Sequence, residues 1–373
     1  MGTLVGVAFA LLAGQDVSLP PCEKERRWVL AEAPVAGTGP FLARDKEGGK
    51  ALPAQGDGRV VRWLIPVVPA GAKKGYAIEK GTAEKAVSLA IGEGPGGSFS
   101  VKAPDREITR FHPAPQGLKH LKPCFYPLVG GGVNVLRGYP IEERAGEVKD
   151  HPHHTGVYHA FGEVNGREYW SKLPIENKKI LRKEAGPVYA RFTAENQWGQ
   201  DLVEVQDVFI LNAGDDAIMD WTITLTAAEG PVVFARDKKM AKEGSFAVRV
   251  TTGLTDADKK KQGQDLMLDA LGNRGEAAIR AAQAPWVDYS GTVDGKKVGV
   301  AVMDHPASFR YPTHWHVRAY GLFAANPWII RGEHKIDKGG SVTFRYRVYV
   351  HSGDAAAGKV AEVYAGFAQA KTE

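Results

Sequence analysis

Short runs of alternating apolar and polar residues, each closed by glycine or proline, constrain the fold of this chain most. In residues 217–226, for example, Met219, Trp221 and Ile223 alternate with polar residues, which places one face of an extended segment in a core. The chain has 44 glycines and 22 prolines in 373 residues, enough to supply a turn after each short run. We therefore predict an all-β fold.

The same pattern recurs along most of the chain and predicts two large antiparallel sheets packed face to face. The clearest strands are expected at 188–196, 202–211, 217–226, 232–235, 246–250, 297–303 and 341–350. Helical spacing is clear only at 355–370, and weaker at 276–284. Residues 254–275 are rich in charged residues and glycine, and we expect an exposed loop there.

We expect the chain to divide into a smaller N-terminal β-sandwich at 21–112 and a large β-sandwich at 113–373, which ends in a short helix. An apolar run between Leu4 and Ala13, followed by small residues, resembles a secretory signal and is too short to span a bilayer. We predict a signal segment at 1–20 and a periplasmic or secreted protein; the alternative is a buried N-terminal strand. Cys22 and Cys124 either form one disulfide or stay as thiols.

Composition and motifs exclude several classes of function. The net charge of +5 is small and spread along the chain, so nucleic acid is not expected as a partner. No glycine-rich phosphate loop, nucleophile elbow or zinc-protease helix occurs. No apolar stretch is long enough to span a membrane, and nucleotide cofactors are not expected.

Histidine is concentrated in two segments of the chain. Residues 150–156 read Asp-His-Pro-His-His-Thr-Gly, and residues 304–316 begin with Asp-His-Pro and end with His314 and His316. In an extended segment His154 would point away from His151 and His153, so the three imidazoles converge only if the chain kinks at Pro152. Because imidazole exchanges protons near neutral pH and binds metals, this concentration predicts a functional site.

Three interpretations of this site are open. In the first, His153 and His154 lie beside a carboxylate and perform acid–base chemistry on a polyol without a cofactor. In the second, His151, His153 and His316 bind a divalent metal, with His314 as an alternative ligand. In the third, the histidines only make structural hydrogen bonds.

The second histidine segment combines imidazoles with arginines and aromatic rings. Such mixtures suit sugars, whose C–H faces stack on rings while their hydroxyl groups take directional hydrogen bonds. We expect a substrate-binding surface, although for Trp315 and Phe323 taken singly a place in the core is the favoured interpretation. Its predicted members are Arg310, Tyr311, His314, Trp315, His316 and Arg318.

A charged segment between two apolar strands supplies the carboxylate that acid–base chemistry needs. Lys242 and Glu243 follow Asp237, Lys238 and Lys239, and either could partner a histidine. A charged surface turn is the alternative. We predict His154, Glu243, His153 and Lys242 as the catalytic set.

Several spaced motifs resemble a known family. They are Lys-Pro-Cys-Phe-Tyr-Pro-Leu at 122–128, Gly-Val-Asn-Val-Leu-Arg at 132–137, the histidine motif at 150–156, Lys-Glu-Gly-Ser-Phe-Ala-Val-Arg-Val at 242–250, and residues 304–326. Over about residues 118–352 the chain resembles the family labelled "methane oxygenase PmoA". The resemblance implies an exported β-rich protein of sugar catabolism with a supersandwich similar to galactose mutarotase.

From these observations we expect an exported carbohydrate-active enzyme, a lyase, hydrolase or epimerase of glycosides or keto-sugars. A His-ligated metal oxygenase and a non-catalytic glycan-binding protein are the alternatives. The partner is a small-molecule carbohydrate in the first and third cases. All depend on the two histidine segments, about 150 residues apart, meeting in the folded chain.

Overall fold

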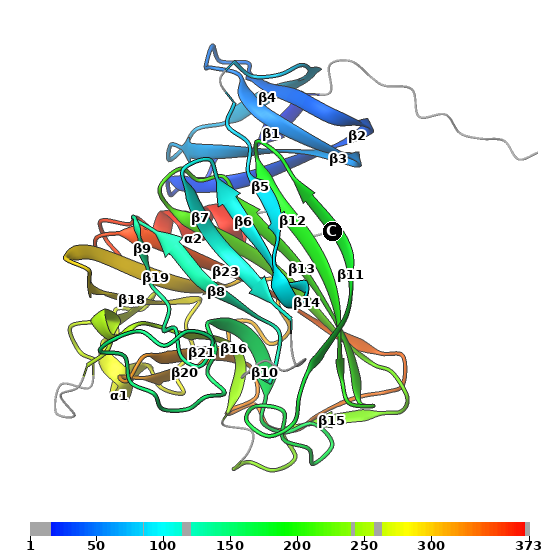
Figure 1. The fold of residues 1–373 in the computed structure, drawn as a ribbon. Coiled ribbons are helices and arrows are strands. Elements are labelled where there is room, and N and C mark those ends of the chain that lie inside the picture. The colour runs from blue at the N-terminus through cyan, green and yellow to red at the C-terminus, as the bar shows by residue number, and fades with distance from the viewer. Residues whose placement is uncertain (1–15, 85, 114–120, 240–242, 257–262, 370–373) are drawn as a thin grey trace, which may run out of the picture.

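The computed structural model describes residues 16–84, 86–113, 121–239, 243–256 and 263–369. The fold class is all-β, as predicted: two large antiparallel sheets pack face to face, and a smaller sheet lies at one end of them (Figure 1). This sandwich follows from the alternating sequence, because each sheet buries one apolar face against the other.

The first large sheet carries both histidine segments. Its strand order is β20-β21-β16-β10-β8-β7-β6-β5, and the short β9 pairs with β8. The strands are β5 (Ala90–Glu93), β6 (Phe99–Ala103), β7 (Arg106–His112), β8 (Cys124–Gly130), β9 (Val133–Asn134), β10 (Val157–Phe161), β16 (Gly244–Arg249), β20 (His314–Arg318) and β21 (Leu322–Asn326).

The second large sheet packs against the first. Its order is β11-β12-β13-β14-β23-β19-β18-β17. The strands are β11 (Glu176–Ala185), β12 (Tyr189–Trp198), β13 (Leu202–Leu211), β14 (Ala217–Ala227), β17 (Met267–Asp269), β18 (Trp286–Val293), β19 (Lys296–Asp304) and β23 (Ser341–Ser352). All seven predicted strands are confirmed: five are long strands of this second sheet, the one predicted at 246–250 is the shorter β16 of the first sheet, and the one at 232–235 is a short strand outside both large sheets.

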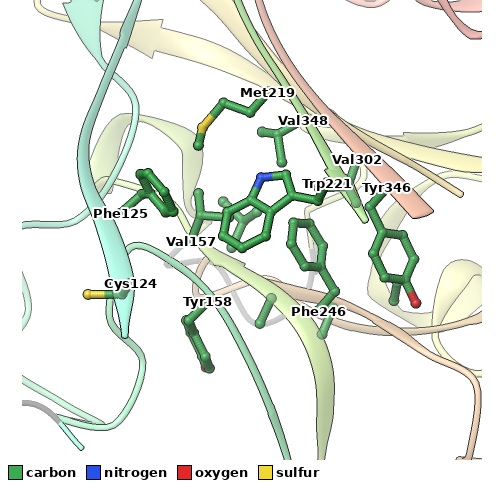
Figure 2. Close-up of a cluster of buried hydrophobic side chains, with 14 of the residues drawn as sticks. Cys124, Phe125, Val157, Tyr158, Met219, Trp221, Phe246, Val302, Tyr346 and Val348 are labelled. Atoms are coloured by element: carbon green, nitrogen blue, oxygen red, sulfur yellow. The ribbon is translucent and has the colours of Figure 1, made fainter. Parts of the chain in front are cut away.

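Figure 2 shows how the two large sheets meet. Trp221 on β14 lies between Phe125 of β8 and Phe246 of β16, with ring centroids 5.1 Å apart in both pairs. Tyr158, one residue after the core residue Val157, points away from this core in the same view. Alternation along β10 and β16 therefore gives the first sheet an inner apolar face and an outer face of different character.

The N-terminal part forms a four-stranded sheet in the order β1-β4-β2-β3, drawn in blue in Figure 1. Its strands are β1 (Asp16–Leu19), β2 (Arg26–Asp45), β3 (Leu52–Val68) and β4 (Lys74–Lys80). Residues 90–112 instead pair into the first large sheet, so sheet membership puts the boundary between β4 and β5 and not at residue 112. Whether the two parts fold separately stays a prediction.

The small elements complete the fold. They are the two-stranded sheet of β15 (Val232–Phe234) and β22 (His334–Ile336), the 3₁₀ turns η1 (Pro95–Gly97) and η2 (Thr252–Leu254), and the helices α1 (Gly275–Ile279) and α2 (Val360–Ala368). Both helices are shorter than predicted. The backbone is left-handed at Ala281, just after α1, and at Lys359, just before α2. Helix α1 therefore cannot continue through Ala281, and α2 cannot begin before Lys359. The expected loop at 254–275 contains the edge strand β17.

The predicted signal segment falls mostly on residues 1–15, which lie outside the described residues, while Asp16–Leu19 form β1 and pair with β4. Cys22 and Cys124 are both free thiols. Cys124 is buried, and burial raises the pKa of its thiol to about 12. Within the described ranges, no helix has the length and apolar character needed to cross a membrane.

Candidate active site

Four adjacent strands bring the two histidine segments onto one face. The register aligns Tyr158 of β10 with Ala247 of β16, Ala324 of β21 and His316 of β20. These residues lie on the outer face, since their neighbour Phe246 packs into the core. Three inter-strand spacings separate the ends of this row by roughly 14 Å. The two histidine segments therefore lie on one shared sheet face, and the expectation that their imidazoles line a common hollow stays a prediction.

The loop before β10 kinks and brings three imidazoles together. His151 has a left-handed backbone, with φ of 40°. The ring of His154 stacks on that of His151 at 4.9 Å and meets that of His153 edge-on at 4.3 Å. The alternative left open by the sequence, a kinked loop with converging rings, is the one observed.

Two buried cations hold this loop from below. Arg137 donates to the carbonyl oxygens of His151 and His154, each at 3.0 Å. Lys122 donates to the carbonyl oxygens of His153, at 3.1 Å, and Trp170. Burial lowers the pKa of the Lys122 ammonium to about 7. The loop is therefore fixed by charged donors rather than by apolar packing.

Arg249 connects the loop to the sheet. Its side chain is 2% exposed and donates to Oδ1 of Asp150 at 2.8 Å and to Nδ1 of His154 at 3.3 Å. The guanidinium also lies 4.7 Å from the ring centroid of Tyr320. The ring of Tyr320 in turn stacks on that of His151, with centroids 5.1 Å apart. Tyr320 follows β20, so this contact joins the first histidine segment to the second.

The contact with Arg249 decides which nitrogen of His154 carries the proton. Arginine has only donors, so Nδ1 of His154 accepts and Nε2 holds the hydrogen. Burial, aided by His153 and Arg249, holds the pKa of His154 far below its usual value. His154 is thus a neutral hydrogen-bond donor. Burial, with Lys122 adding to it, also lowers the pKa of His153 to about 4.

Glu243 directly precedes β16, and its side chain extends toward His316 on β20. Its carboxylate Oε2 lies 3.8 Å from Nδ1 of His316, and its side chain is 34% exposed. It also interacts electrostatically with Tyr158, Tyr320 and Arg318. Glu243 is therefore the carboxylate at the β20 end of the row, next to a buried imidazole. Lys242, the other predicted member of this segment, lies outside the described residues.

Half of the second histidine segment does not reach the site. The guanidinium of Arg310 donates to the carbonyl oxygens of Pro327, Gly332 and Glu333. The hydroxyl groups of Tyr311 and Tyr364 on α2 are 2.6 Å apart. Both side chains are occupied in holding loops and the C-terminal helix, and their prediction as substrate contacts gains no support.

Trp315 is fully buried, and its indole N–H donates to the carbonyl oxygen of Ala284 at 2.9 Å. The prediction that it contacts substrate is wrong, because it lies between His314 and His316 and therefore points inward. His314 shares the outer face with His316 but lies one row further along, toward Arg310 and Arg331. Arg318 stays at the edge of the site, paired to Glu276 at 2.8 Å.

Sequence reasoning gave no role to a buried hydrogen-bond chain on β10. His159 Nδ1 lies 2.6 Å from Oε1 of Glu204, and its Nε2 lies 2.7 Å from Oγ of Ser245. Glu204 also accepts from Asn196 and Trp198. The chain ties β10 and β16 to the opposite sheet behind Glu243, and so fixes the backbone from which the carboxylate extends. The crowding of histidines was a signal, but nothing in the sequence separated His159 from the others.

The described part of the chain contains no group of three or more His, Cys, Asp or Glu side chains placed to hold a metal ion. The proposed ligands His151, His153 and His316 therefore do not form such a group. The metal hypothesis gains no support from these residues and stays a prediction.

Residues 98–365 match the family described as "Family of unknown function (DUF6807)". This chain belongs to that family. The match covers the whole candidate site and leaves out residues 1–97, which include the N-terminal sheet and β5, and residues 366–373. The family's description names no activity, so the expected methane oxygenase label finds no support. No curated protein matches the sequence.

Solved structures resemble the DUF6807 chain only weakly. One, described as heparan sulfate lyase HepC from Pedobacter heparinus, is 11% identical, with a TM-score of 0.38, over 72% of this chain and 36% of that one. Another, described as a protein in the Glycosyl Hydrolase Family 38 from Enterococcus faecalis, is 11% identical, with a TM-score of 0.42, over 94% and 47%. The chain thus spans less than half the length of these carbohydrate-active enzymes.

Proposed function

We propose that this protein is a carbohydrate-active enzyme that transfers a proton through Glu243 and His316. The observation that carries the proposal is the carboxylate of Glu243, one third exposed, beside the buried imidazole of His316 at 3.8 Å. A carboxylate within reach of both substrate and imidazole is the usual equipment for general acid–base catalysis, and such contacts often tighten only when substrate binds.

His154 has a different role in this proposal from the one the sequence predicted. Its Nε2–H is a donor and its imidazole is neutral, so it suits holding a carbonyl or hydroxyl oxygen rather than removing a proton. Arg249 fixes its orientation. The two ends of the row therefore have different roles in the proposal. At the β20 end Glu243 and His316 exchange the proton. At the β10 end His154, oriented by Arg249, holds an oxygen on which charge develops.

A sugar fits the rim of this site better than an apolar ligand. His151 is 42% exposed, and the rings of His153 and Tyr320 lie beside it at the surface. Flat rings next to directional donors and acceptors match the C–H faces and hydroxyl groups of a pyranose. The chemistry needs only side chains, without a cofactor.

Two further expectations belong to the proposal. Two large packed sheets are compatible with the supersandwich that the resemblance implies, and the apolar run at 4–13 favours a periplasmic or secreted location. N-terminal sequencing of the protein recovered from the periplasm or medium tests the location. A start near residue 21, after the predicted signal segment 1–20, is expected, and recovery only from the cytoplasm contradicts the location.

The test of function is turnover of a panel of glycosides and 3-keto-glycosides, followed by mass spectrometry, with wild type, Glu243→Gln and His154→Ala. Product from wild type and a loss of about 100-fold in each variant are expected. His334→Ala, on the separate two-stranded sheet, is the control and keeps its activity. Saturable binding without any product would make the protein a glycan-binding module, and undiminished turnover in both variants would place the chemistry elsewhere.

A further inference from the structure

Three basic side chains are buried at the end of the site around His154. Arg137 and Arg249 are each 2% exposed, and both pair with the carboxylate of Asp150. Lys122, fully buried beneath the same loop, bonds to two carbonyl oxygens. Glu147 and Glu168 act electrostatically on Arg137 and Lys122, so Arg249 is the one of the three that shares its carboxylate without a second acidic neighbour among its largest interactions. Buried charges are costly unless they are paired.

Several buried polar atoms at this end have no hydrogen-bond partner within the described part of the chain. Nε of Arg249 and the hydroxyl group of Tyr158 are two of them, beside Nε of Arg137 and Oγ1 of Thr155. Tyr158 is fully buried and lies on the outer face, pointing away from the core in Figure 2. The remaining nitrogens of Arg249 already contact Asp150 and His154. A native protein rarely leaves such donors unsatisfied, so their partner is expected to arrive with a ligand.

We infer that the substrate carries a carboxylate, as a uronic acid does, and that Arg249 receives it with help from Tyr158. The sugar part of this inference rests on the proposed function. The carboxylate gives Arg249 a second acidic partner and accepts from its Nε and from the hydroxyl group of Tyr158, while the Nε2–H of His154 is a third donor nearby. Charge-assisted bonds of this kind orient a planar anion as well as bind it.

The balance of charge favours a single carboxylate over a doubly charged group. Asp150 is already present on one side of Arg249, and Glu243 lies at the other end of the row. Each would repel a dianion more strongly than a monoanion. The site is therefore polarised, with a positive end that holds the acid group and a carboxylate at the far end that accepts a proton.

A second polar cleft shows what a balanced charge distribution looks like. It holds about 380 Å³ between the N-terminal sheet and the outer face of β13, β14 and β23. Arg62 pairs with Glu32, and Arg191 pairs with Asp207 through two bonds. Each of these arginines has a carboxylate of its own, whereas Arg249 shares Asp150 with Arg137 and its Nε has no partner within the described residues.

The experiment compares matched pairs of methyl glycosides and methyl uronides in the gluco, galacto and manno series, by calorimetry at low salt. A sulfate ester of each hexoside is included. Wild type is expected to bind the uronide of at least one pair about tenfold more tightly than its neutral partner. Arg249→Gln is expected to abolish this preference and Tyr158→Phe to reduce it. Arg110→Gln, which removes an arginine paired with Glu107 on β7, preserves it.

The outcomes separate this inference from the proposed function. Equal or weaker binding of every uronide overturns the acidic substrate, even if neutral glycosides are turned over as proposed. Tighter binding of the sulfate esters overturns the carboxylate. A preference that survives Arg249→Gln overturns the role of Arg249. If Arg249→Gln fails to fold, Tyr158→Phe decides, because removing one hydroxyl group leaves the ring and its packing intact; an unchanged preference in that variant contradicts the inference.

Discussion

The two Asp-His-Pro segments, at 150–152 and 304–306, look alike in sequence and do opposite things in the structure. Asp150 is partly exposed, and although burial raises its pKa, Arg249 and His151 bring it below its usual value. Asp304 is fully buried, and burial raises the pKa of its carboxyl group to about 7. The carboxylate of the first segment is paired with Arg137 and Arg249 near the surface, whereas the carboxyl group of the second segment is sealed, that is, fully buried in the fold.

The difference lies in what each segment bonds to. Asp304 accepts from the backbone N–H of Thr313 at 2.8 Å and so closes its own loop. His305, next to it, lies edge-on to Phe367 of α2. In the first segment, the loop is held through its carbonyl oxygens by Arg137 and Lys122, so the rings of His151 and His154 are not used to close the loop: His151 is exposed, and His154 accepts from Arg249. Histidine content alone therefore does not identify a site; the source of its hydrogen bonds does.

The largest expected effect is a difference in kcat/KM between a variant of His154 in the first segment and a variant of His314 in the second. His154→Ala removes the donor that Arg249 orients and is expected to lower kcat/KM by about 100-fold. His314→Ala, one row away from His316, is expected to change it by less than about threefold. Steady-state kinetics on a substrate from the glycoside panel checks both. Equal losses would mean that His314 also serves the chemistry, in contradiction to the role given to His316 alone in the second segment.

Asp304→Asn sharpens the contrast through stability. A carboxyl group whose pKa is raised to about 7 keeps a proton in the folded protein that the unfolded chain loses near pH 4. Between pH 4 and 7 the folded state binds more protons, so this group makes stability fall as the pH rises. Asparagine cannot titrate. The free energy of unfolding of the variant, relative to wild type, should therefore increase by on the order of 2 kcal/mol between pH 4.5 and 8.

Urea unfolding at several pH values measures this difference. Subtracting wild type from variant removes the contribution of other groups, including His153, whose lowered pKa makes stability rise with pH between about 4 and 6.5. A difference that is constant from pH 4.5 to 8 would show that Asp304 is ionised in the folded protein and that the second segment is not sealed.

The smallest expected effect concerns the first segment. Lys122→Met removes a buried charge that, together with burial, lowers the pKa of His153. The pKa of His153 should rise toward its usual value in the variant, while that of His334, near Arg310, stays unchanged. Titration of the histidine ring protons by NMR measures both. An unchanged His153 would mean that burial alone sets its pKa and that Lys122 acts only through the two carbonyl oxygens.

Periodicity predicted the fold well because the long strands of the second sheet bury every other side chain. It also contained the answer for Trp315: if His314 and His316 face outward, the residue between them must face the core. The domain boundary was harder to predict, because no feature of the sequence at 90–112 shows that these residues join the sheet of β8 rather than the N-terminal sheet. Their pairing is set by contacts with strands elsewhere in the chain, such as that of β7 with β8.

The candidate site was predicted in part. His154, Glu243 and His316 do share a face, but the cations that organise it were missed. Arg249 stands in the otherwise apolar run 246–250, and a charge in a buried strand was a usable signal. Lys122 had no such signal, because its burial results from contacts with Trp170 and His153 that the fold alone creates.

The most direct test of the account is the crystal structure of the protein with a bound methyl uronide from the calorimetric series. The account predicts sugar density on the outer face of β10, β16, β21 and β20, with the carboxylate on Arg249 and the ring within reach of Glu243. Sugar bound instead in the cleft between the N-terminal sheet and β13, with this face unaltered, would contradict it.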